Sequence, residues 1–238
     1  MENLLEIVSV SKHFGGFTAL SGVSLNVPKG ERLGLIGPNG SGKTTLINCI
    51  SGALFNEEGS IGFKGEPISK LPAYQRTRKG IARSFQIPKP FRSMTVLENL
   101  LVPLSYVRGV SGQAATQAAE EILVGMGFSD KILAECSQLS QVELRKLELA
   151  RAMAAKPELL ISDEAMAGLA GAEIDEVLAI LFSLNEQGIT IIMIEHIMQA
   201  VMAFSQRVVC LDAGQIICEG TPHEVVANEY VQRAYLGD

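Results

Sequence analysis

Eight consecutive residues near position 40 have the types and spacing needed to bind phosphate groups. They read Gly37-Pro38-Asn39-Gly40-Ser41-Gly42-Lys43-Thr44 and fit the pattern G-x-x-x-x-G-K-[ST], so we call them the phosphate loop. Glycines allow successive main-chain N–H groups to turn toward one phosphate, and the N-terminus of a following helix adds a positive dipole end. Lys43 is expected to reach the β- and γ-phosphates of a nucleotide, and the Thr44 hydroxyl to ligate Mg²⁺. A fortuitous glycine-rich turn is the alternative, but an apolar strand precedes this run and a helical stretch follows it.

Two adjacent carboxylates follow an apolar run about 120 residues further along the chain. Leu159–Ser162 has the pattern of a short buried strand, and Asp163 and Glu164 come directly after it. Because side chains alternate across a strand, we expect these carboxylates to point to opposite sides and to have different roles. Asp163 suits the Mg²⁺ shell, and Glu164 suits polarising an attacking water molecule. An acidic pair at a strand end is by itself more often an exposed turn, so this interpretation depends on the phosphate loop.

The elements that must position these residues alternate between strands and helices, except in a helical middle third. Predicted strands are Leu4–Val10, Gly22–Val27, Arg32–Ile36, Gly59–Gly65, Gly80–Gln86, Leu159–Ser162, Ile189–Ile194, and a hairpin of Arg207–Leu211 with Gln215–Cys218. Predicted helices are Lys43–Ser51, an interrupted helical tract from the capping box Thr95-x-x-Glu98 to about Ala155, Ala172–Gln187, His196–Phe204, and a last helix opened by the capping box Thr221–Glu224. This order predicts an α/β fold with a largely parallel sheet covered by helices.

Bulk composition excludes several other classes of protein. Apolar residues make up 47% and charged residues 19% of the 238 residues, as in globular proteins with a buried core. The net charge of −6 argues against nucleic acid as the main partner. The four cysteines form no CxxC pair, the N-terminus lacks the basic start of a signal peptide, and no apolar run is long enough to span a membrane. We therefore expect a soluble, cytoplasmic protein.

In chain order, these residues resemble the ATPase subunit of an ABC transporter over nearly the whole chain. The matching positions are Phe14 for the aromatic that stacks on adenine, Gly37–Thr45 for Walker A, Gln86 for the Q-loop, Leu159–Glu164 for Walker B and His196 for the switch histidine. Alone, Gln86 would be read as a surface glutamine and His196 as a structural histidine. The resemblance implies that Glu164, His196 and Lys43 act in catalysis, that Thr45 joins the ATP site, and that Gln86 joins Thr44 and Asp163 at the metal.

The same resemblance implies one P-loop (RecA-like) ABC ATPase domain over residues 1–238. Its core and an N-terminal antiparallel β lobe are expected in residues 1–90 and 156–238, and an inserted α-helical lobe in residues about 91–155. ATP and Mg²⁺ are the implied ligands. Within the family, the chain is most similar to LivG-type ATP-binding proteins of branched-chain amino-acid importers, on the segments Phe14–Gly16, Ile81–Gln86, Met94–Leu100, Met166–Leu169, Glu195–Met198 and Ala234–Gly237. Urea and amide importers and the lipopolysaccharide-export ATPase share parts of this pattern.

The family's signature LSGGQ is replaced by Leu139-Ser140-Gln141-Val142-Glu143. In the family this loop acts in trans on the γ-phosphate held by a second subunit. Ser140-x-x-Glu143 is still a capping box, so we expect a well-formed helix start. Val142 stands where glycine is usual, and we expect it to resist a positive φ and to add bulk. Ala165 and Ala170 likewise replace the usual proline and the usual acid or amide.

Two functions remain open on the sequence. The first is Mg-ATP hydrolysis that energises import of branched-chain amino acids or a similar small polar solute; the second is a nucleotide-gated, weakly hydrolysing subunit of a heterodimer. A DNA-repair or translation ATPase is disfavoured because the chain is too short for coiled-coil insertions or a tandem domain.

The implied partners are transmembrane permease subunits, a second ABC ATPase subunit (identical or different) and, indirectly, an extracellular solute-binding protein. The chain would then lie on the inner face of the cell membrane, held by permease subunits docked near Gln86 and Pro88–Leu100. Phe91, Met94 and Leu97 beside Arg92 could line that docking groove, with core packing as the alternative.

Overall fold

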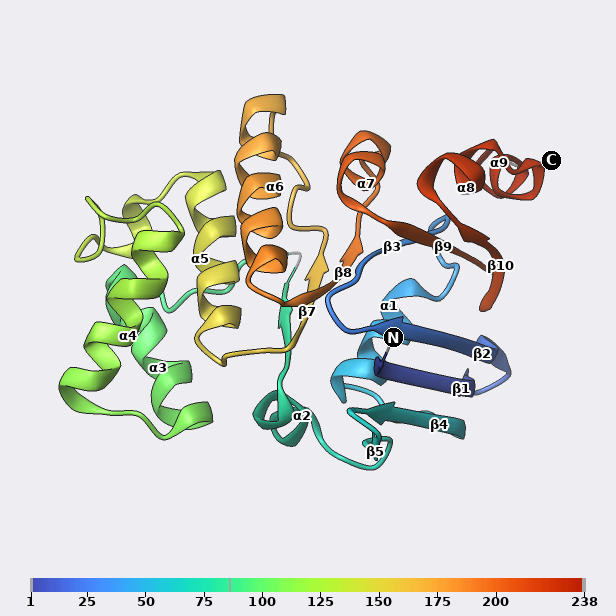
Figure 1. The fold of residues 1–238 in the computed structure, drawn as a ribbon, viewed down its shortest axis with the longest axis horizontal. Coiled ribbons are helices and arrows are strands. Elements are labelled where there is room, and N and C mark those ends of the chain that lie inside the picture. Colours follow the sequence, from blue (N-terminus) through green and yellow to red (C-terminus); the bar gives the residue numbers. More distant parts are fainter. Residues whose placement is uncertain (1, 86, 237–238) are drawn as a thin grey trace.

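The protein folds around two β-sheets, with a group of helices at the end far from the β1–β2 hairpin (Figure 1). A computed structural model describes residues 2–85 and 87–236. The predicted Q-loop residue Gln86 therefore lies outside the described residues, as does Gly237. The predicted α/β class, with a P-loop core, an antiparallel β sheet from the N-terminal part of the chain and a set of helices between β6 and β7, is confirmed.

The larger sheet has six strands in the order β10-β9-β3-β8-β7-β6. Their bounds are β10 Gln215–Gly220, β9 Arg207–Asp212, β3 Arg32–Ile36, β8 Thr190–Ile194, β7 Leu159–Asp163 and β6 Ile81–Ser84. All neighbouring strands pair in parallel except β9 and β10, which form the predicted hairpin. β7 and β8 are buried along their whole length, as parallel strands covered on both faces must be. Because parallel strands end at one edge, the residues after β3, β7 and β8 meet there.

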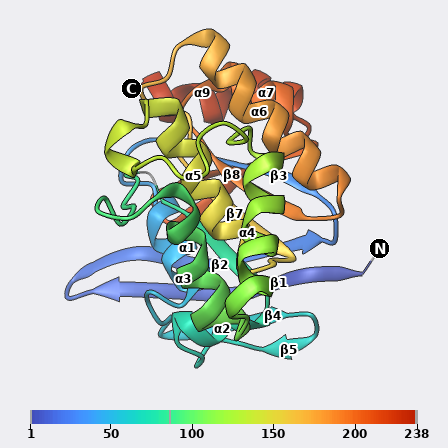
Figure 2. The same cartoon turned by 90° about the vertical axis from the view of Figure 1, so that its left-hand side faces the viewer.

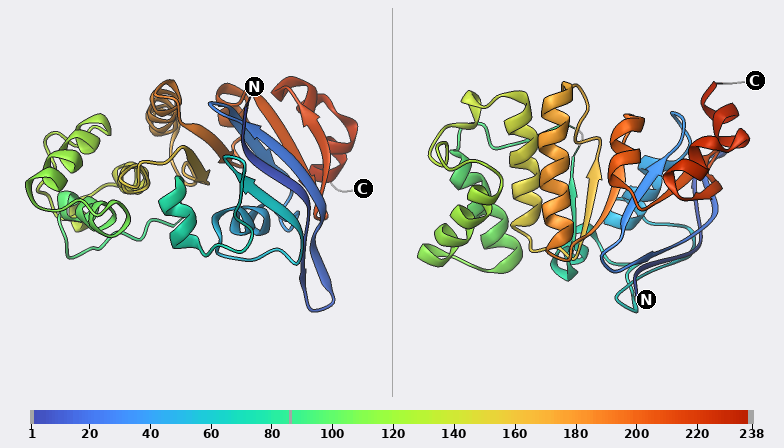
Figure 3. Two further views of the ribbon diagram at one scale, coloured as in Figure 1. Left: turned by 60° about the horizontal axis from the view of Figure 1, so that its bottom comes forward. Right: turned by 45° about the horizontal axis from the view of Figure 1, so that its top comes forward.

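The smaller sheet is antiparallel, in the order β2-β1-β4-β5. It consists of β1 Asn3–Phe14, β2 Phe17–Pro28, β4 Glu58–Phe63 and β5 Glu66–Pro67. Strands β1 and β2 run several residues beyond the predicted Leu4–Val10 and Gly22–Val27, and their hairpin projects from the body of the molecule (Figure 3). The apolar alternation is lost at the far end of the hairpin, where residues 13–18 are exposed, although Ala19 and Leu20 beyond the predicted strand are buried.

The helices are α1 Lys43–Ser51, α2 Ala73–Lys79, α3 Val96–Arg108, α4 Gly112–Gly125, α5 Gln141–Met153, α6 Gly171–Glu186, α7 Met198–Phe204, α8 Pro222–Ala227 and α9 Glu229–Leu236, with a short 3₁₀ turn at Cys136–Gln138. Helix α1 has the predicted bounds, and the three predicted capping boxes are formed at Thr95, Ser140 and Thr221. Helix α7 begins two residues after the predicted start, because His196 lies in a bend and Ile197 is the extended N-cap residue. Among the described residues, no helix has the length and apolarity to cross a membrane.

Helix α2 was not predicted, because its seven residues carry no apolar stripe. Its anchor is Arg76, which is fully buried. The guanidinium donates to the main-chain carbonyls of Cys49 (2.5 Å), Ile50 (2.9 Å), Leu71 (2.8 Å) and Ser69 (3.0 Å). Two of these carbonyls belong to the last turn of α1, where carbonyls lack helical partners. One buried cation therefore ties α2 to the helix that follows the phosphate loop.

The apolar core lies on both faces of the larger sheet. On one face, Leu160, Ile191 and Met193 pack in one cluster with residues of α3 to α7. On the other, Leu159, Ile161 and Ile192 pack with α1 and the antiparallel sheet. Alternate residues of β7 and β8 thus point to opposite clusters, as strand geometry requires. Figure 2 looks onto the end built by α3, α4 and α5.

Candidate functional site

Most of the predicted site residues meet at one cavity of about 250 Å³ at the carboxyl edge of the larger sheet. It is lined by Phe14, Phe17, Ala19, Asn39, Gly40, Ser41, Gly42, Lys43, Thr44, Thr45, Glu164 and His196. These residues come from the β1–β2 hairpin, the phosphate loop, the start of α1 and the turns after β7 and β8. The fold therefore brings together an aromatic pair, a glycine-rich loop with one lysine, and a carboxylate beside a histidine.

The phosphate loop needs glycine at two positions because of close main-chain approach. A Cβ on Gly37, whose φ is +148°, would lie 2.1 Å from the Leu211 carbonyl oxygen. A Cβ on Gly42, whose φ is +107°, would lie 2.7 Å from the Ala19 carbonyl oxygen. Strand β9 and the β1–β2 hairpin thus press on the loop from two sides. This packing holds the loop amides at the start of α1, where a phosphate would be bound.

Lys43 is buried at the base of the loop, with 6% of its surface exposed. Its ammonium donates to the carbonyls of Gly37 (2.7 Å) and Pro38 (3.0 Å). Burial lowers the pKa of Lys43, while the nearby carboxylates of Glu164 and Asp163 act in the opposite direction. A desolvated ammonium held by two neutral carbonyls, with main-chain amides around it, fits the anionic phosphates of a nucleotide.

Glu164 and His196 face each other across the cavity. His196 Nε2 lies 2.9 Å from Glu164 Oε1. Strand β7 ends at Asp163, so the predicted strand alternation does not orient Glu164. Instead Glu164 has φ +48°, a left-handed conformation that costs a non-glycine residue on the order of 1 kcal/mol. Its N–H is held by the Ile194 carbonyl at 2.9 Å. The turn thus points the carboxylate toward His196.

Asp163 is not among the residues that line the cavity, and it contacts a residue that sequence reasoning missed. Its Oδ2 is 2.5 Å from Arg83 Nη2, and both side chains are 11% exposed. The same guanidinium donates to Asn48 Oδ1 at 2.7 Å, which links β6, β7 and α1. The sequence of β6 could have pointed to Arg83, because a charge in a strand of otherwise buried residues needs a partner.

The residues present fit a Mg²⁺ ion that is bound largely by phosphate and water. Thr44 opens onto the cavity, and Asp163 is close enough to Lys43 to affect its pKa. No cluster of three His, Cys, Asp or Glu side chains able to hold a metal occurs among residues 2–85 and 87–236. Mg²⁺ in nucleotide sites uses one or two protein oxygens plus phosphate oxygens, so such a cluster is not needed.

Phe14 and Phe17 form the outer wall of the cavity. They are opposite each other in the β1–β2 register, and 47% and 62% of their surfaces are exposed. Lys12 Nζ lies 5.3 Å from the centre of the Phe14 ring. Phe17 was not predicted, although an exposed aromatic across a Gly-Gly turn from Phe14 is a usable signal. A pair of exposed aromatics suits a planar base.

The predicted signature residues do not line this cavity. Ser140 caps α5 by accepting from the Glu143 N–H at 3.3 Å, and the Glu143 carboxylate accepts from the Ser140 N–H at 2.9 Å. Gln141 is exposed. Val142 lies in the first turn of α5 and packs against the apolar cluster of the helical end. The expectation that Val142 must resist a positive φ is therefore wrong, because the backbone there is helical.

A second, larger cavity of about 420 Å³ lies between β6, α2, α3 and α5. Phe85, Phe91, Tyr106 and Arg151 are among its lining residues. Leu97 instead packs against the apolar core, and neither Met94 nor Arg92 lines the cavity. Of the four residues expected at a groove, the structure places only Phe91 there.

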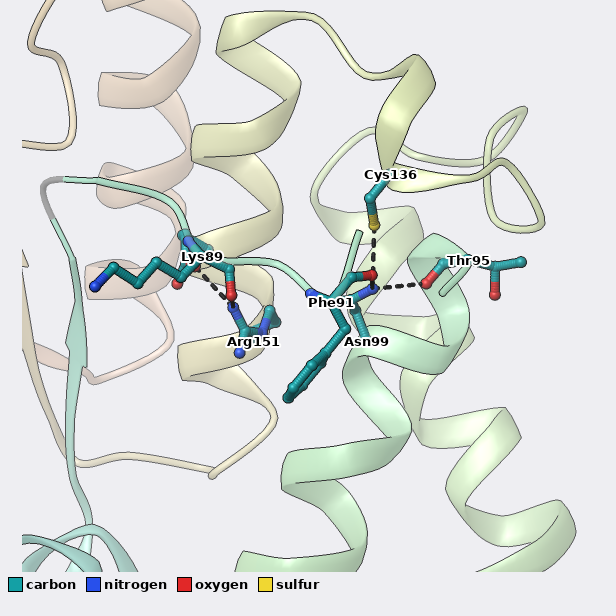
Figure 4. A network of polar contacts seen from close by, with 7 residues as sticks. Lys89, Phe91, Thr95, Asn99, Cys136 and Arg151 are labelled. Carbon is teal, nitrogen blue, oxygen red and sulfur yellow. Dashed lines mark hydrogen bonds and ion pairs between the residues drawn. The ribbon is translucent and has the colours of Figure 1, made fainter. Parts of the chain in front are cut away.

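The segment after residue 86 is held against the helices by two polar clamps (Figure 4). Asn99, which is fully buried, accepts from the Phe91 N–H at 2.8 Å and donates to the Phe91 carbonyl at 3.2 Å. The Glu148 carboxylate accepts from the Lys89 N–H at 2.8 Å, and Arg151 donates to the Lys89 carbonyl at 2.9 Å. The Arg151 guanidinium also lies 5.3 Å from the centre of the Phe91 ring. These contacts fix Phe91 as one wall of the second cavity.

Comparison with known proteins gives concordant matches. Residues 20–167 match the family model described as ABC transporter, and residues 215–238 match that of the branched-chain amino acid ATP-binding cassette transporter. The high-affinity branched-chain amino acid transport ATP-binding protein BraF of Pseudomonas aeruginosa is 34% identical, over 99% of this chain and 98% of its own. The methionine import ATP-binding protein MetN of Rhizobium etli is 37% identical, over 99% of this chain and 66% of its own.

Solved structures agree. The ADP conformation of an ATP-binding cassette of an ABC transporter superposes with a TM-score of 0.92 at 32% identity, over 100% of both chains. A dimeric cassette in a post-hydrolysis state with bound ADP and phosphate superposes with a TM-score of 0.82 at 27% identity, over 92% of this chain and 98% of that one. On these matches and the geometry of the phosphate loop, the chain belongs to the ABC transporter family, as an ATP-binding subunit with ATPase activity.

Proposed function

We propose that the protein hydrolyses Mg-ATP in the phosphate-loop cavity and thereby energises an importer of branched-chain amino acids. The observation that carries the hydrolytic role is the 2.9 Å contact between Glu164 and His196 at the cavity that also contains Lys43. A carboxylate held by a histidine beside a phosphate site can orient and deprotonate a water molecule.

Each part of the cavity then has a role in the reaction. Phe14 and Phe17 stack against the adenine ring. The amides of residues 40–45 and the Lys43 ammonium hold the phosphates and stabilise charge on the transferring phosphoryl group. Mg²⁺, held through Thr44 and Asp163, would neutralise phosphate charge. Glu164 accepts the proton of the attacking water, and His196 Nε2 holds Glu164 in place. The predicted metal role of Gln86 remains a proposal that rests on the family resemblance.

The solute is proposed from the relatives. BraF and the LivG proteins are named for branched-chain amino acid transport, and residues 215–238 match a model described for such transporters. MetN is named for methionine import, so amino-acid import is common to these matches. Permease subunits would dock at the second cavity, where Phe91 and Arg151 present an apolar wall beside a charge, and would hold the chain at the inner face of the membrane. An extracellular solute-binding protein would act through those permeases.

A second ABC ATPase subunit is proposed as the partner across the ATP site. Ser140 and Gln141 lie at an exposed helix start away from their own chain's cavity, which supports an action in trans. Val142 and Ala170 favour a heterodimer in which a different chain supplies an intact signature to the ATP held by Lys43. The alternative, a nucleotide-gated subunit that hydrolyses weakly, rests on the same two residues.

The test is co-expression with permease subunits from the same genome, followed by reconstitution in vesicles with their binding protein. We expect leucine, isoleucine or valine to stimulate ATP hydrolysis and to be taken up, and Lys43→Ala to abolish both. Hydrolysis stimulated only by another solute would overturn the solute assignment. ATP binding with no hydrolysis in the full complex would favour the weakly hydrolysing alternative.

A further inference from the structure

Glu195 is a buried carboxylate to which no role has been given. It lies between the end of β8 and His196, and only 2% of its surface is exposed. A carboxylate removed from water is costly unless hydrogen bonds compensate it. Its position next to a catalytic histidine suggests that this cost serves the site.

The Glu195 side chain holds the turn that carries Glu164. Its Oε1 accepts from the Met166 N–H at 2.9 Å, and Met166 follows Glu164 by two residues. The turn is further closed by the Ala167 N–H, which donates to the Glu164 carbonyl at 3.2 Å. Because Glu164 has φ +48°, the turn is strained, and external hydrogen bonds are needed to keep it.

Neighbouring residues therefore hold Glu164 from two sides. His196 contacts the Glu164 carboxylate, while Glu195 fixes the main chain that follows Glu164. A shift of the turn would move the Glu164 carboxylate away from the attacking water, and small misplacements of a catalytic group cost large factors in rate.

The same turn is held from the helical end of the molecule. Arg145, in α5, donates through Nη2 to the Ala167 carbonyl at 3.0 Å. Gln141, at the start of the same helix, approaches Gly168 so closely that a Cβ there would lie 2.8 Å from Gln141 Nε2. The residues after Glu164 thus lie between Glu195 on one side and the N-terminal part of α5 on the other.

We propose that Glu195 is a positioning residue for ATP hydrolysis. Its ionised carboxylate holds the strained turn that carries Glu164 from one side, while α5 holds the same turn from the other side. The inference rests on the proposed role of Glu164 and deepens it. Among the described residues, the Glu195 carboxylate is hydrogen-bonded to the Met166 and His196 N–H groups and is not part of the cavity lining, so we expect it to act on the rate and not on nucleotide binding.

The charged groups around Glu195 make the strength of its hydrogen bond with the Met166 N–H depend on pH. The pKa of Glu195 is raised to about 7: burial is the largest cause and the Glu164 carboxylate adds to it, whereas the Met166 and His196 N–H groups and the Arg145 guanidinium act in the opposite direction. The charged groups that face it are thus Glu164 after β7 and Arg145 on α5, with the His196 ring turned toward Glu164. A carboxylate accepts hydrogen bonds more strongly than a carboxylic acid, so the lock strengthens as pH rises through about 7.

The test uses two substitutions at this position in the assembled transporter. Glu195→Leu removes the acceptor, and we expect kcat to fall at least about tenfold while the KM for ATP stays within about twofold. Glu195→Gln keeps an acceptor that cannot ionise. Between pH 6 and 8 the ratio of wild-type to Glu195→Gln kcat should rise about tenfold, because the Glu195 carboxyl ionises across this range and the glutamine amide does not.

Thr190→Val is the matched control. Thr190 is buried at the other end of β8 and accepts from the Gly30 N–H at 2.8 Å, so its loss removes a buried hydrogen bond far from the site. It should lower Tm and leave kcat and its pH profile unchanged. A constant ratio for Glu195→Gln, an unchanged kcat for Glu195→Leu, or an equal loss of kcat in Thr190→Val would each overturn the proposal. Retained hydrolysis in Glu164→Gln would instead overturn the function on which it rests.

Discussion

The phosphate loop and the start of α5 are both polar helix starts that the family uses on ATP, but they are built differently. The phosphate loop has every residue of its pattern and is fixed by its own chain, with β9 and the β1–β2 hairpin against its glycines. The start of α5 has lost the family's glycines yet keeps a complete capping box. Side chains can therefore vary at a helix start whose main-chain amides are hydrogen-bonded by a capping box. They cannot vary where the main chain of a neighbouring segment leaves no room for a Cβ.

Gly37→Ala should have the largest effect, because it disrupts the packing of the phosphate loop. The new Cβ would lie 2.1 Å from the Leu211 carbonyl oxygen, so the loop or β9 must move. We expect a loss of about 3 kcal/mol or more in the free energy of unfolding and no measurable ATP affinity. Chemical denaturation and nucleotide titration measure both. Gly65→Ala, at φ +73° with nothing within 4 Å of the new Cβ, is the control and should cost only about 1 kcal/mol.

The free energy of unfolding should depend on pH through Glu195, which holds the turn after Glu164. Its folded-state pKa of about 7 lies above the ordinary value of 4.5. Below pH 4.5 the group is protonated in both states; as pH rises from 4.5 to 7 the unfolded chain ionises first, and the folded state loses up to about 3 kcal/mol. Denaturation at pH 4.5, 6 and 8 should show Glu195→Gln gaining stability over the wild type through this window. A difference independent of pH would contradict the assignment.

Val142→Gly tests whether the start of α5 tolerates the glycine that is usual in the family. Because Val142 is helical and packs on the core, glycine should destabilise the protein by about 1 kcal/mol, seen as a lower Tm. In a homodimer, ATPase activity should rise, because glycine restores the usual family residue in the signature that acts on the partner's ATP. In a heterodimer that uses only the partner's signature, activity should stay constant. Val142→Ala serves as the control for lost bulk without added backbone freedom, and a higher Tm for glycine would contradict the packing.

Ala170→Asp should give a small change that is stabilising. Ala170 is the N-cap residue of α6, where only the Glu173 carboxylate reaches back, to the Ala170 N–H at 2.8 Å. An aspartate would cap the free amides of the first turn and add about 1 kcal/mol. Thermal unfolding measures this, with Ala170→Val as the variant that cannot cap. An equal Tm for both variants would show that the first turn of α6 is already satisfied.

The sequence predicted what local chemistry determines. Helix α1, strand β3 and the three capping boxes follow from residues within a few positions of one another. Most residues that line the phosphate-loop cavity were named by a strict pattern and by resemblance, whereas Phe17 and Ala19 were not.

What the sequence did not predict depends on contacts between distant segments. Helix α2 exists because Arg76 reaches carbonyls more than 20 residues away. The ion pair of Arg83 with Asp163 joins β6 to β7, and the hydrogen bond of Glu195 with Met166 joins the segments that follow β8 and β7, which are neighbours only in the folded protein. Phe17 and Phe14 line the cavity because of the β1–β2 register, which the apolar pattern did not extend far enough to define.

The most direct test of the central claim compares Glu164→Gln with the wild type in ATP binding and in single-turnover hydrolysis. Glutamine preserves the shape of the side chain but cannot take a proton from water. We predict ATP affinity within about twofold of wild type and hydrolysis slowed by about 100-fold to 10,000-fold. Hydrolysis at the wild-type rate in Glu164→Gln would contradict the account, because the Glu164–His196 pair would then not be the catalytic centre.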